Sequence, residues 1–371
     1  MIQARFPLSD PDRPCAPVQR GAVVPVLIIC GVALLDLLTG AGMSWLPLLA
    51  VGPALAAALC GPWSVLRIGL LAVAVGGFLS AQTDTPVRGR AIMLAAVAAV
   101  TLASCLASLL RRRRERVLAA VRSVAEAAQN ALLRPVPAEV GQFQVAVRYS
   151  AAAAEARVGG DLYALVSSPY GVRLIVGDVR GKGLPAVSTA ALVLGVFREA
   201  AYDEPDLLDV VGRIERSLAR NLAPDDFVTA VVAGYPGSGR MELVNCGHAP
   251  PLLVNRSGVV AVEPTRPAPP LGLASLGGEL PSLQLVPFDD GDQMLLYTDG
   301  VIEARDRGRE YFPLMERVPR HICEEPSRTL ASLHDDLLAH VGGRLHDDAA
   351  LLLLRKPVTS GMPAAAEVPL S

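Results

Sequence analysis

The stretch VRLIVGD, residues 172–178, is an apolar run that ends in a glycine and an aspartate. A second stretch, LLYTDG at residues 295–300, ends in the same way. Short apolar runs of this kind, closed by glycine, are typical of buried β-strands. An aspartate at the end of a buried strand loses its water and needs a cation or a hydrogen-bond donor in its place. Both stretches therefore predict a buried strand that carries a carboxylate at one end.

Two further stretches have related features. VGGD at residues 158–161 opens an apolar run, and HDD at residues 346–348 precedes another. Any single aspartate could instead be a helix cap or a turn residue, but four such places in one domain favour a shared site. Glycine allows backbone carbonyls to approach a metal closely. Carboxylates, carbonyls and water, without Cys or His, select Mg²⁺ or Mn²⁺, and a pair of such ions can perform phosphate chemistry.

The chain around these stretches consists of short β-type runs separated by glycine turns. The predicted strands are Phe143–Tyr149, Leu162–Ser167, Val172–Gly177, Phe227–Tyr235, Met241–Asn245, Pro251–Asn255, Gln293–Tyr297 and Ala349–Leu354. The predicted helices are Leu184–Tyr202, Pro205–Leu222 and Ser327–Val341. Because the strands outnumber the helices and no regular βαβ alternation occurs, we expect an α+β domain with antiparallel sheets.

The N-terminal part of the chain has a different composition. Hydrophobic residues make up 51% of the chain and charged residues 19%, and only five charged residues lie between residues 21 and 110. Four apolar runs are found there: Val23–Leu38, Trp45–Cys60, Val65–Ser80 and Ala91–Leu110. The last is long enough to cross a bilayer. The middle two are short and interrupted by Gly and Pro, and they could form either a re-entrant pair or two tilted helices. We therefore expect an all-α transmembrane region of about four helices.

Arginines indicate the orientation of this region. Arg111–Arg114 and Arg116 follow the last run, and further arginines precede the first. Positive flanks stay in the cytoplasm, so both ends should lie inside and the number of spans should be even. Asp36 lies in the first run, either as a functional intramembrane acid or as a residue that reaches the interface. We expect a multi-pass protein of the cell membrane with a cytoplasmic C-terminal domain.

A connector helix is predicted between the two parts. Arg116–Arg134 contains no Gly or Pro, and an apolar stripe runs along it: Val117, Val121, Val124, Ala128 and Leu132. This helix could form a homodimer, or it could pack on its own domain. We expect a cytoplasmic segment at 1–20, the transmembrane region at 21–110, the connector at 111–134, the catalytic domain at 135–357 and a disordered tail at 358–371. A net charge of −2 argues against nucleic-acid binding.

The C-terminal domain resembles the metal-dependent protein serine/threonine phosphatases (PPM, the protein phosphatase 2C superfamily), in their SpoIIE-like bacterial branch. Five motifs occur in the family's order over residues 140–356: GGDLY at 159–163, GDVRGKG at 177–183, NCGHAPP at 245–251, YTDGVIEA at 297–304 and DDAA at 347–350. The resemblance implies an αββα sandwich of two antiparallel sheets flanked by helices, with a metal cluster at one edge.

The resemblance also implies roles for individual residues. Asp161 and Asp299 match metal ligands, Asp178 matches the ligand that bridges both metals, and Val179 should add its backbone carbonyl. Asp347 matches the last ligand, in preference to its neighbour Asp348. The cofactors would be two divalent cations, Mn²⁺ or Mg²⁺. The nucleophile would be a water that bridges the metals, so no side chain is expected to be the nucleophile.

Ala164, Lys182 and His248 lie in or beside these motifs. Where the family's first motif commonly has a second acid, this chain has Ala164, which could weaken the binding of one metal ion. Lys182 could bind substrate phosphate at the start of a helix, or it could be a solvated residue of a glycine turn. His248 could contact substrate, although a structural hydrogen bond that holds its turn is the favoured interpretation.

We expect a membrane-anchored phosphatase that hydrolyses phosphoserine or phosphothreonine on a partner protein. Kinship points to a phosphorylated anti-sigma-factor antagonist in a partner-switching pathway. One alternative is a catalytically silent module that binds a phosphoprotein. Another is a transporter or channel with a cytoplasmic regulatory domain.

Overall fold

The strands beyond residue 138 form two antiparallel sheets in the computed structural model, which describes residues 18–39, 45–82, 86–151, 159–223, 225–274, 277 and 279–358. The first sheet has the order β1 (Glu139–Val140), β2 (Phe143–Ser150), β11 (Ala349–Arg355), β10 (Gln293–Tyr297), β7 (Leu252–Asn255), β8 (Gly258–Ala261). The second has the order β3 (Leu162–Ser168), β4 (Gly171–Val179), β5 (Val228–Tyr235), β6 (Arg240–Cys246), β9 (Gln284–Pro287).

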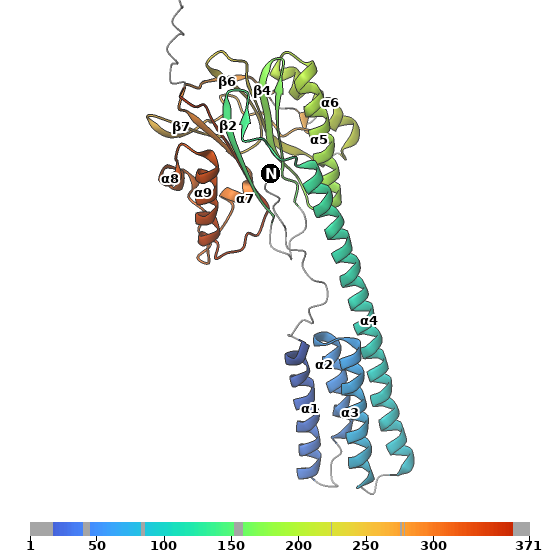
Figure 1. Cartoon of the computed structure of the whole chain (residues 1–371). Helices are drawn as coiled ribbons and strands as arrows, with labels where there is room; N and C mark the ends of the chain where they lie inside the picture. The colour runs from blue at the N-terminus through green and yellow to red at the C-terminus, as the bar shows by residue number, and fades with distance from the viewer. Residues whose placement is uncertain are drawn as a thin grey trace, which may run out of the picture. The chain divides into compact units, whose positions relative to one another are not determined.

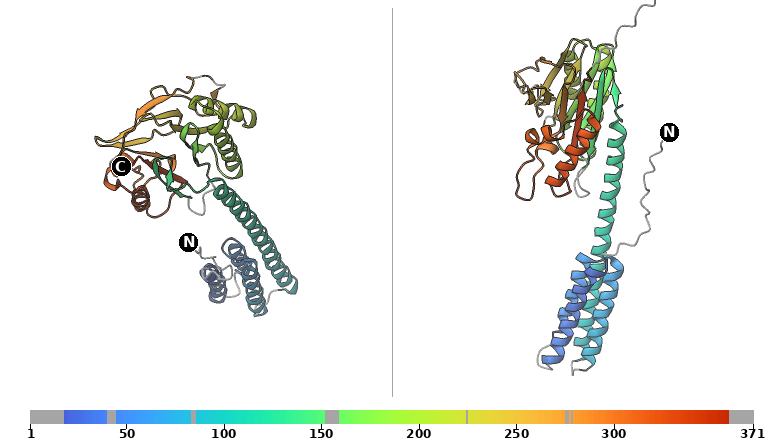
Figure 2. Two further views of the ribbon diagram at one scale, coloured as in Figure 1. Left: turned by 45° about the horizontal axis from the view of Figure 1, so that its top comes forward. Right: turned by 60° about the vertical axis from the view of Figure 1, so that its left-hand side comes forward.

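Helices cover the outer face of each sheet (Figures 1 and 2). α5 (Leu184–Asp203) and α6 (Leu207–Asn221) pack on the second sheet, whereas α8 (Leu314–His321) and α9 (Pro326–His340) pack on the first. A single helical turn, α7 (Asp299–Ile302), follows β10. The expected αββα sandwich is therefore confirmed.

The buried positions explain why the strands read as continuous apolar runs. In β4, six consecutive residues from Val172 to Gly177 are buried, because one face meets the other sheet and the other face meets α5. Three aromatic rings, those of Phe143, Tyr235 and Phe288, contact one another in the largest core cluster. A second cluster lies between the first sheet and α8 and α9.

Predicted and observed elements agree closely for the longer strands and helices. The elements that the sequence patterns did not predict are the strands β1, β8 and β9 and the helices α7 and α8. Four of these five have only two to four residues, which is too short for a hydrophobic period to be recognised. α8 is longer but contains Pro319, which is a helix-breaking signal in a sequence.

The N-terminal unit consists of helices. They are α1 (Val18–Thr39), the 3₁₀ turn η2 (Leu46–Ala50) continued by α2 (Val51–Leu59), α3 (Pro62–Ala81) and the first part of α4 (Val87–Leu132). α3 and α4 approach closely at Gly69, where a Cβ atom would lie 2.0 Å from Thr101 Cγ2. Asp36 Oδ1 accepts a hydrogen bond of 3.1 Å from the Trp45 amide. This bond at the start of η2 gives Asp36 a structural role.

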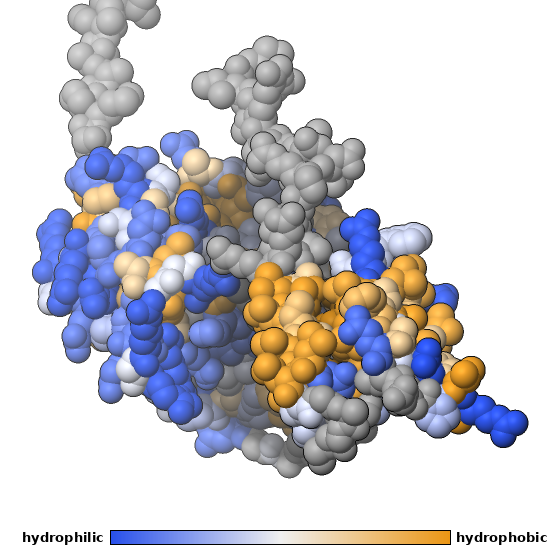
Figure 3. Space-filling model, turned by 90° about the horizontal axis from the view of Figure 1, so that it is seen from below, coloured by the Kyte–Doolittle hydropathy of each residue, from blue (hydrophilic) through white to orange (hydrophobic). Residues whose placement is uncertain are grey.

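Among the described helices, four are long and apolar enough to cross a membrane: α1, α3, α4 and α5. The segment Leu46–Leu59 is apolar but shorter. α5 buries its apolar side against the second sheet and belongs to the sandwich. The N-terminal helices instead expose large apolar side chains, such as Leu27 at 64%, Phe78 at 66% and Leu102 at 66%. Figure 3 shows this gathering of hydrophobic surface on one face of the molecule.

The predicted connector is the C-terminal part of α4 and not a separate helix. Contacts divide the chain into two units, Met1–Ala120 and Val121–Ser371, so the boundary lies inside this helix. Along the predicted stripe, Val117 and Val124 are more than half exposed, whereas Ala128 and Leu132 pack beside Ala125 and Val187. The end of α4 thus packs on its own domain. The expected cytoplasmic segment lies almost entirely outside the described residues, as does the expected disordered tail.

Candidate functional site

The four predicted aspartates come from both sheets. Asp161 precedes β3 and Asp178 lies near the end of β4, and these strands pair so that Leu162 faces Gly177. Asp299 follows β10 and Asp347 precedes β11, which pair so that Tyr297 faces Leu351. Each sheet therefore brings two of the acids to one end of a strand pair.

A hydrogen bond joins the two strand ends. The Thr298 hydroxyl donates to Asp161 Oδ2 over 2.8 Å and accepts the Ala350 amide over 2.9 Å. Thr298 is fully buried and Asp161 is 2% exposed, so this contact ties the two sheets together inside the sandwich. Thr298 was not identified from the sequence, although it lies next to Asp299 in the quoted motif.

Glycines permit the close approach of these segments. A Cβ atom on Gly160 would lie 2.4 Å from the Val179 carbonyl oxygen, and one on Gly300 would lie 1.8 Å from the Asp348 carbonyl oxygen. The Val179 amide donates to the Gly160 carbonyl over 3.2 Å. We expected glycine to let a metal approach backbone carbonyls. In the structure, Gly160 and Gly300 let two backbone segments pack closely against each other.

The acids influence one another's ionisation, which indicates that they lie near each other. Burial raises the pKa of Asp161 well above its usual value, and the carboxylates of Asp178, Asp348 and Asp299 raise it further. Burial, Asp299 and Asp347 raise the pKa of Asp178 to about 7. Burial and Asp347 also raise the pKa of Asp299. A group of desolvated carboxylates of this kind is stabilised by a cation.

Lys182 provides positive charge beside these acids. Its Nζ lies 2.7 Å from Asp347 Oδ1, and the two side chains are 37% and 44% exposed. The Asp348 amide donates to the same Asp347 oxygen over 2.9 Å. Lys182 also lowers the pKa of Asp178 and of Asp299, opposing the larger effects of burial. Lys182 therefore lies beside these acids while its side chain stays accessible to solvent.

Asp348 lies on the inner side of the site. It is 3% exposed, and its Oδ2 accepts a hydrogen bond of 3.0 Å from the Gly159 amide. The same oxygen accepts the hydroxyl of Tyr149, which in turn accepts the Gln129 side-chain amide over 2.8 Å. The sequence patterns did not identify Tyr149 or Gln129. Asp348 was recognised only as the less favoured member of its pair.

His248 connects the two sheets through hydrogen bonds to Thr229 of β5 and Tyr297 of β10. Its Nε2 lies 3.0 Å from the Tyr297 carbonyl oxygen, so Nε2 carries the proton and donates it. Its Nδ1 then accepts the Thr229 hydroxyl over 3.0 Å. Burial lowers the pKa of His248 to about 4, which keeps the ring neutral. Both ring nitrogens of His248 are thus engaged with other elements. Asn245 holds the turn: its Nδ2 donates to the His248 carbonyl over 3.0 Å, and its Oδ1 accepts the His248 amide over 2.9 Å.

Ala164 is 5% exposed and belongs to the main core. Alternation along β3 places its side chain on the face opposite to that of Tyr163 and on the same face as Leu162. The acid that the family commonly has here is thus replaced by an apolar residue within an apolar cluster.

The donor set of this site fits hard divalent cations. Carboxylates and backbone carbonyls without thiolates suit Mg²⁺ and Mn²⁺. Among the residues that the structure describes, no group of three or more His, Cys, Asp or Glu side chains is arranged so that it could hold a metal ion. The fit therefore depends on the type and mutual influence of the acids.

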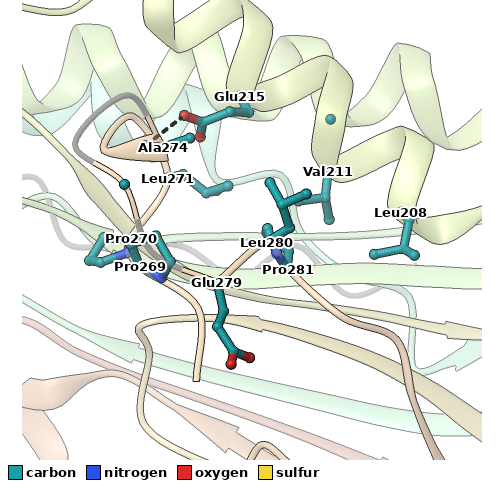
Figure 4. Close-up of a pocket in the computed structure, with 12 residues that line it drawn as sticks. Leu208, Val211, Glu215, Pro269, Pro270, Leu271, Ala274, Glu279, Leu280 and Pro281 are labelled. Atoms are coloured by element: carbon teal, nitrogen blue, oxygen red, sulfur yellow. Dashed lines mark hydrogen bonds between the residues drawn. The ribbon is translucent and has the colours of Figure 1, made fainter. Parts of the chain in front are cut away.

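A separate apolar cavity of about 250 Å³ lies between α6 and the loop that follows residue 268 (Figure 4). Leu208, Val211, Leu271 and Leu280 line it. Glu215 at its margin accepts the Gly272 amide over 2.7 Å. None of the predicted site residues lines this cavity, so it is distinct from the acidic edge.

Comparison with known proteins identifies the family of the C-terminal domain. Residues 168–357, slightly more than half of the chain, match the family model described as Stage II sporulation protein E (SpoIIE). The phosphoserine phosphatase RsbU of Bacillus subtilis is 24% identical over 213 residues, which are 54% of this chain and 61% of that protein. The chain thus spans less than two thirds of the length of this relative.

Two solved structures have the same fold. The SiaA-PP2C domain of Pseudomonas aeruginosa is 16% identical, with a TM-score of 0.56 over 66% of this chain and 98% of that one. The RsbU and RsbW domains of a Mycobacterium tuberculosis protein are 25% identical, with a TM-score of 0.50 over 58% of this chain and 60% of that one. The sandwich is therefore a PP2C fold.

Proposed function

Because this chain belongs to the SpoIIE family, we propose that it is a metal-dependent protein serine/threonine phosphatase. The observation that carries the proposal is the junction between Thr298 and Asp161, which brings acids from both sheets to one site. The phosphoserine phosphatase activity named for RsbU supports the reaction class.

We assign the metal ligands to the carboxylates of Asp161, Asp178, Asp299 and Asp347 and to the backbone carbonyl of Val179. Two divalent cations held there, Mn²⁺ or Mg²⁺, would supply an activated water for attack on phosphorus and would neutralise phosphate oxygens. Thr298 fixes the orientation of Asp161 through its hydrogen bond. No side chain serves as the nucleophile.

Lys182 is the residue that we assign to the substrate phosphate. Its ammonium group forms an ion pair with Asp347 at the exposed side of the site. In the sequence, Lys182 lies two residues before the first residue of α5. A helix N-terminus favours negative charge, so Lys182 and α5 together suit a phosphate group. His248 is withdrawn from the substrate role because both of its ring nitrogens already have partners in the protein.

The substrate that we propose is a phosphorylated anti-sigma-factor antagonist, within a partner-switching pathway. Family kinship supports this choice, together with the names of the RsbU relative and of the RsbU and RsbW domains. The chemistry of the site requires only a phosphate monoester on an exposed serine or threonine.

We also propose that the N-terminal helices anchor the protein in the cell membrane. The exposed apolar side chains of α1, α3 and α4 support this location, because lipid tails would cover them. The arginines Arg111–Arg114 support a cytoplasmic catalytic domain. The exposed Val117 and Val124 on α4 are compatible with a homodimer through this helix.

Hydrolysis of a phosphate ester by the full-length protein in detergent tests the proposal. We expect turnover that needs Mn²⁺, stops with EDTA and is lost in Asp178→Asn and Asp299→Asn. Glu316→Gln, the same chemical change at an exposed residue of α8, should retain full turnover. Metal binding without turnover in the wild type would favour the silent binding module, for which Ala164 is the main support.

A further inference from the structure

The last turns of α4 contain a buried polar residue in an otherwise apolar contact. Gln129 is 6% exposed and lies between Ala125, which contacts α5 through Val187, and Leu132, which is partly buried. A glutamine in such a place costs free energy unless its amide is hydrogen-bonded. Its partner is Tyr149 on β2, whose hydroxyl oxygen accepts the Gln129 Nε2 proton over 2.8 Å.

The donor and the acceptor of the Gln129–Tyr149 and Tyr149–Asp348 hydrogen bonds follow from the chemistry of the groups. A carboxylate can only accept, so the Tyr149 hydroxyl must donate its single proton to Asp348. Tyr149 can then only accept from Gln129, which must present its NH₂ group. Burial and the Asp348 carboxylate raise the pKa of Tyr149, so the hydroxyl keeps the proton that it donates.

Asp348, which accepts the Tyr149 hydroxyl, also forms hydrogen bonds with two segments of the acidic site. Its Oδ2 accepts the amide of Gly159, two residues before Asp161, over 3.0 Å. A Cβ atom on Gly159 would lie 2.6 Å from the same oxygen, so the backbone rests directly on the carboxylate. The backbone amide of Asp348 donates to Asp347 over 2.9 Å. Asp348 therefore contacts segments that carry two of the four proposed ligands, one through its side chain and the other through its backbone amide.

We propose that Gln129 and Tyr149 are positioning residues of the metal site, acting through Asp348 on Asp161 and Asp347. This inference rests on the proposed function, because it concerns the same site. Neither residue is one of the proposed metal ligands. Hydrogen-bonded partners of this type orient metal ligands, and their loss typically weakens metal binding by about 10–100-fold. The metal site is then completed by a residue of α4, outside the sandwich itself.

Mn²⁺ affinity of the full-length protein in detergent, measured by calorimetric titration, tests this inference. The variants are Gln129→Met and Tyr149→Phe, which keep volume and remove one hydrogen-bonding group each, and their combination. We expect each single variant to bind Mn²⁺ about tenfold more weakly. The double variant should bind no more weakly than Tyr149→Phe alone, because Gln129 acts through the tyrosine hydroxyl.

A control variant and two contrary results complete the test. Glu126→Met, an exposed position on the same part of α4, should leave Mn²⁺ affinity unchanged. Mn²⁺ affinities of both single variants within twofold of the wild type would overturn the positioning role of Gln129 and Tyr149. Losses of Mn²⁺ affinity that multiply in the double variant would overturn it as well. A wild-type protein that binds no Mn²⁺ would overturn both the proposed function and the positioning role of Gln129 and Tyr149.

Discussion

The acidic site has two sides that differ in exposure and in chemistry. The outer rim consists of Asp178, Lys182, Asp299 and Asp347, which are at least partly accessible to solvent. The inner wall consists of Asp161, Thr298, Asp348, Tyr149 and Gln129, of which all but Tyr149 are buried.

The contrast is sharpest between two adjacent residues. Asp347 lies on the rim with a lysine as its ion-pair partner, whereas Asp348 lies on the wall with a tyrosine and a backbone amide as donors. Exposed ion pairs contribute little to stability. Buried polar groups that lose their partners cost considerably more. The comparison teaches that changes on the rim should reduce activity with little loss of stability, whereas changes on the wall should reduce stability together with metal affinity.

The largest effect is expected from a change on the rim. Asp178→Asn replaces the proposed bridging ligand with a neutral amide and should abolish Mn²⁺-dependent turnover. The loss should exceed the roughly 10–100-fold that removal of a hydrogen-bond partner of a ligand causes. Without metal, the variant should be as stable as the wild type or more so, because like-charge repulsion falls. Steady-state kinetics and hydrogen exchange of β4 amides measure both effects, and retained turnover would contradict the assignment.

The next effect concerns pH in the metal-free protein. The pKa of Asp178 rises from its usual value near 3.8 to about 7 on folding. Stability from this group is therefore fully present below pH 3.8 and is lost as pH rises through 7, by up to about 4 kcal/mol. Hydrogen exchange of the sandwich in EDTA, corrected for intrinsic rates, should record this loss.

Two controls sharpen the pH measurement. Excess Mn²⁺ should cancel the loss by stabilising the ionised acid. Asp178→Asn should reduce the dependence on pH, because the variant lacks the titrating group. An identical pH dependence in the variant and the wild type would show that other acids cause it.

A change on the wall should have an intermediate effect. Thr298→Val keeps the shape of the side chain but leaves Asp161 Oδ2 and the Ala350 amide without their partner. We expect a loss of about 1–3 kcal/mol in stability and a weaker affinity for Mn²⁺. Thermal unfolding and metal titration of the same sample measure the two quantities. Weaker metal binding without any loss of stability would remove the distinction between wall and rim.

The smallest effect is expected from Lys182→Gln. The ion pair with Asp347 is more than one third exposed on both sides, so its loss should change stability by less than about 1 kcal/mol. Affinity for Mn²⁺ should stay equal or increase, because the lysine no longer competes for Asp347. The Michaelis constant for a phosphopeptide should increase if Lys182 binds phosphate. An unchanged constant would return Lys182 to a purely electrostatic role.

The sequence predicted the rim more completely than the wall. The rim acids Asp178, Asp299 and Asp347 lie in short motifs at strand ends, where the local sequence pattern identifies a carboxylate. Asp161 is the one acid of the wall that such a motif identified. Tyr149 and Gln129 lie in an ordinary strand and an ordinary helix, and their pairing spans 20 residues. Asp348 meets Tyr149 across 199 residues. Local periodicity carries no information about such contacts, which arise only when the two sheets and α4 are assembled.

The same reasoning applies to the helices. Hydropathy finds α1 and α5 alike, since both are long and apolar enough to cross a membrane. Only packing separates them: α5 buries eight residues in the sandwich, whereas α1 exposes leucines such as Leu27 and Leu38. The strands and helices of the sandwich were predictable because their runs exceed one structural period. The division of α4 between two units was not predictable, because the helix is continuous across the boundary.

The central claim is that acids from two sheets hold a pair of divalent cations at one edge of the sandwich. Anomalous scattering from crystals of the protein soaked in Mn²⁺ tests it most directly. We predict two anomalous peaks in contact with Asp161, Asp178, Asp299 and Asp347. Ordered side chains of these four residues without any manganese peak between them would contradict the account.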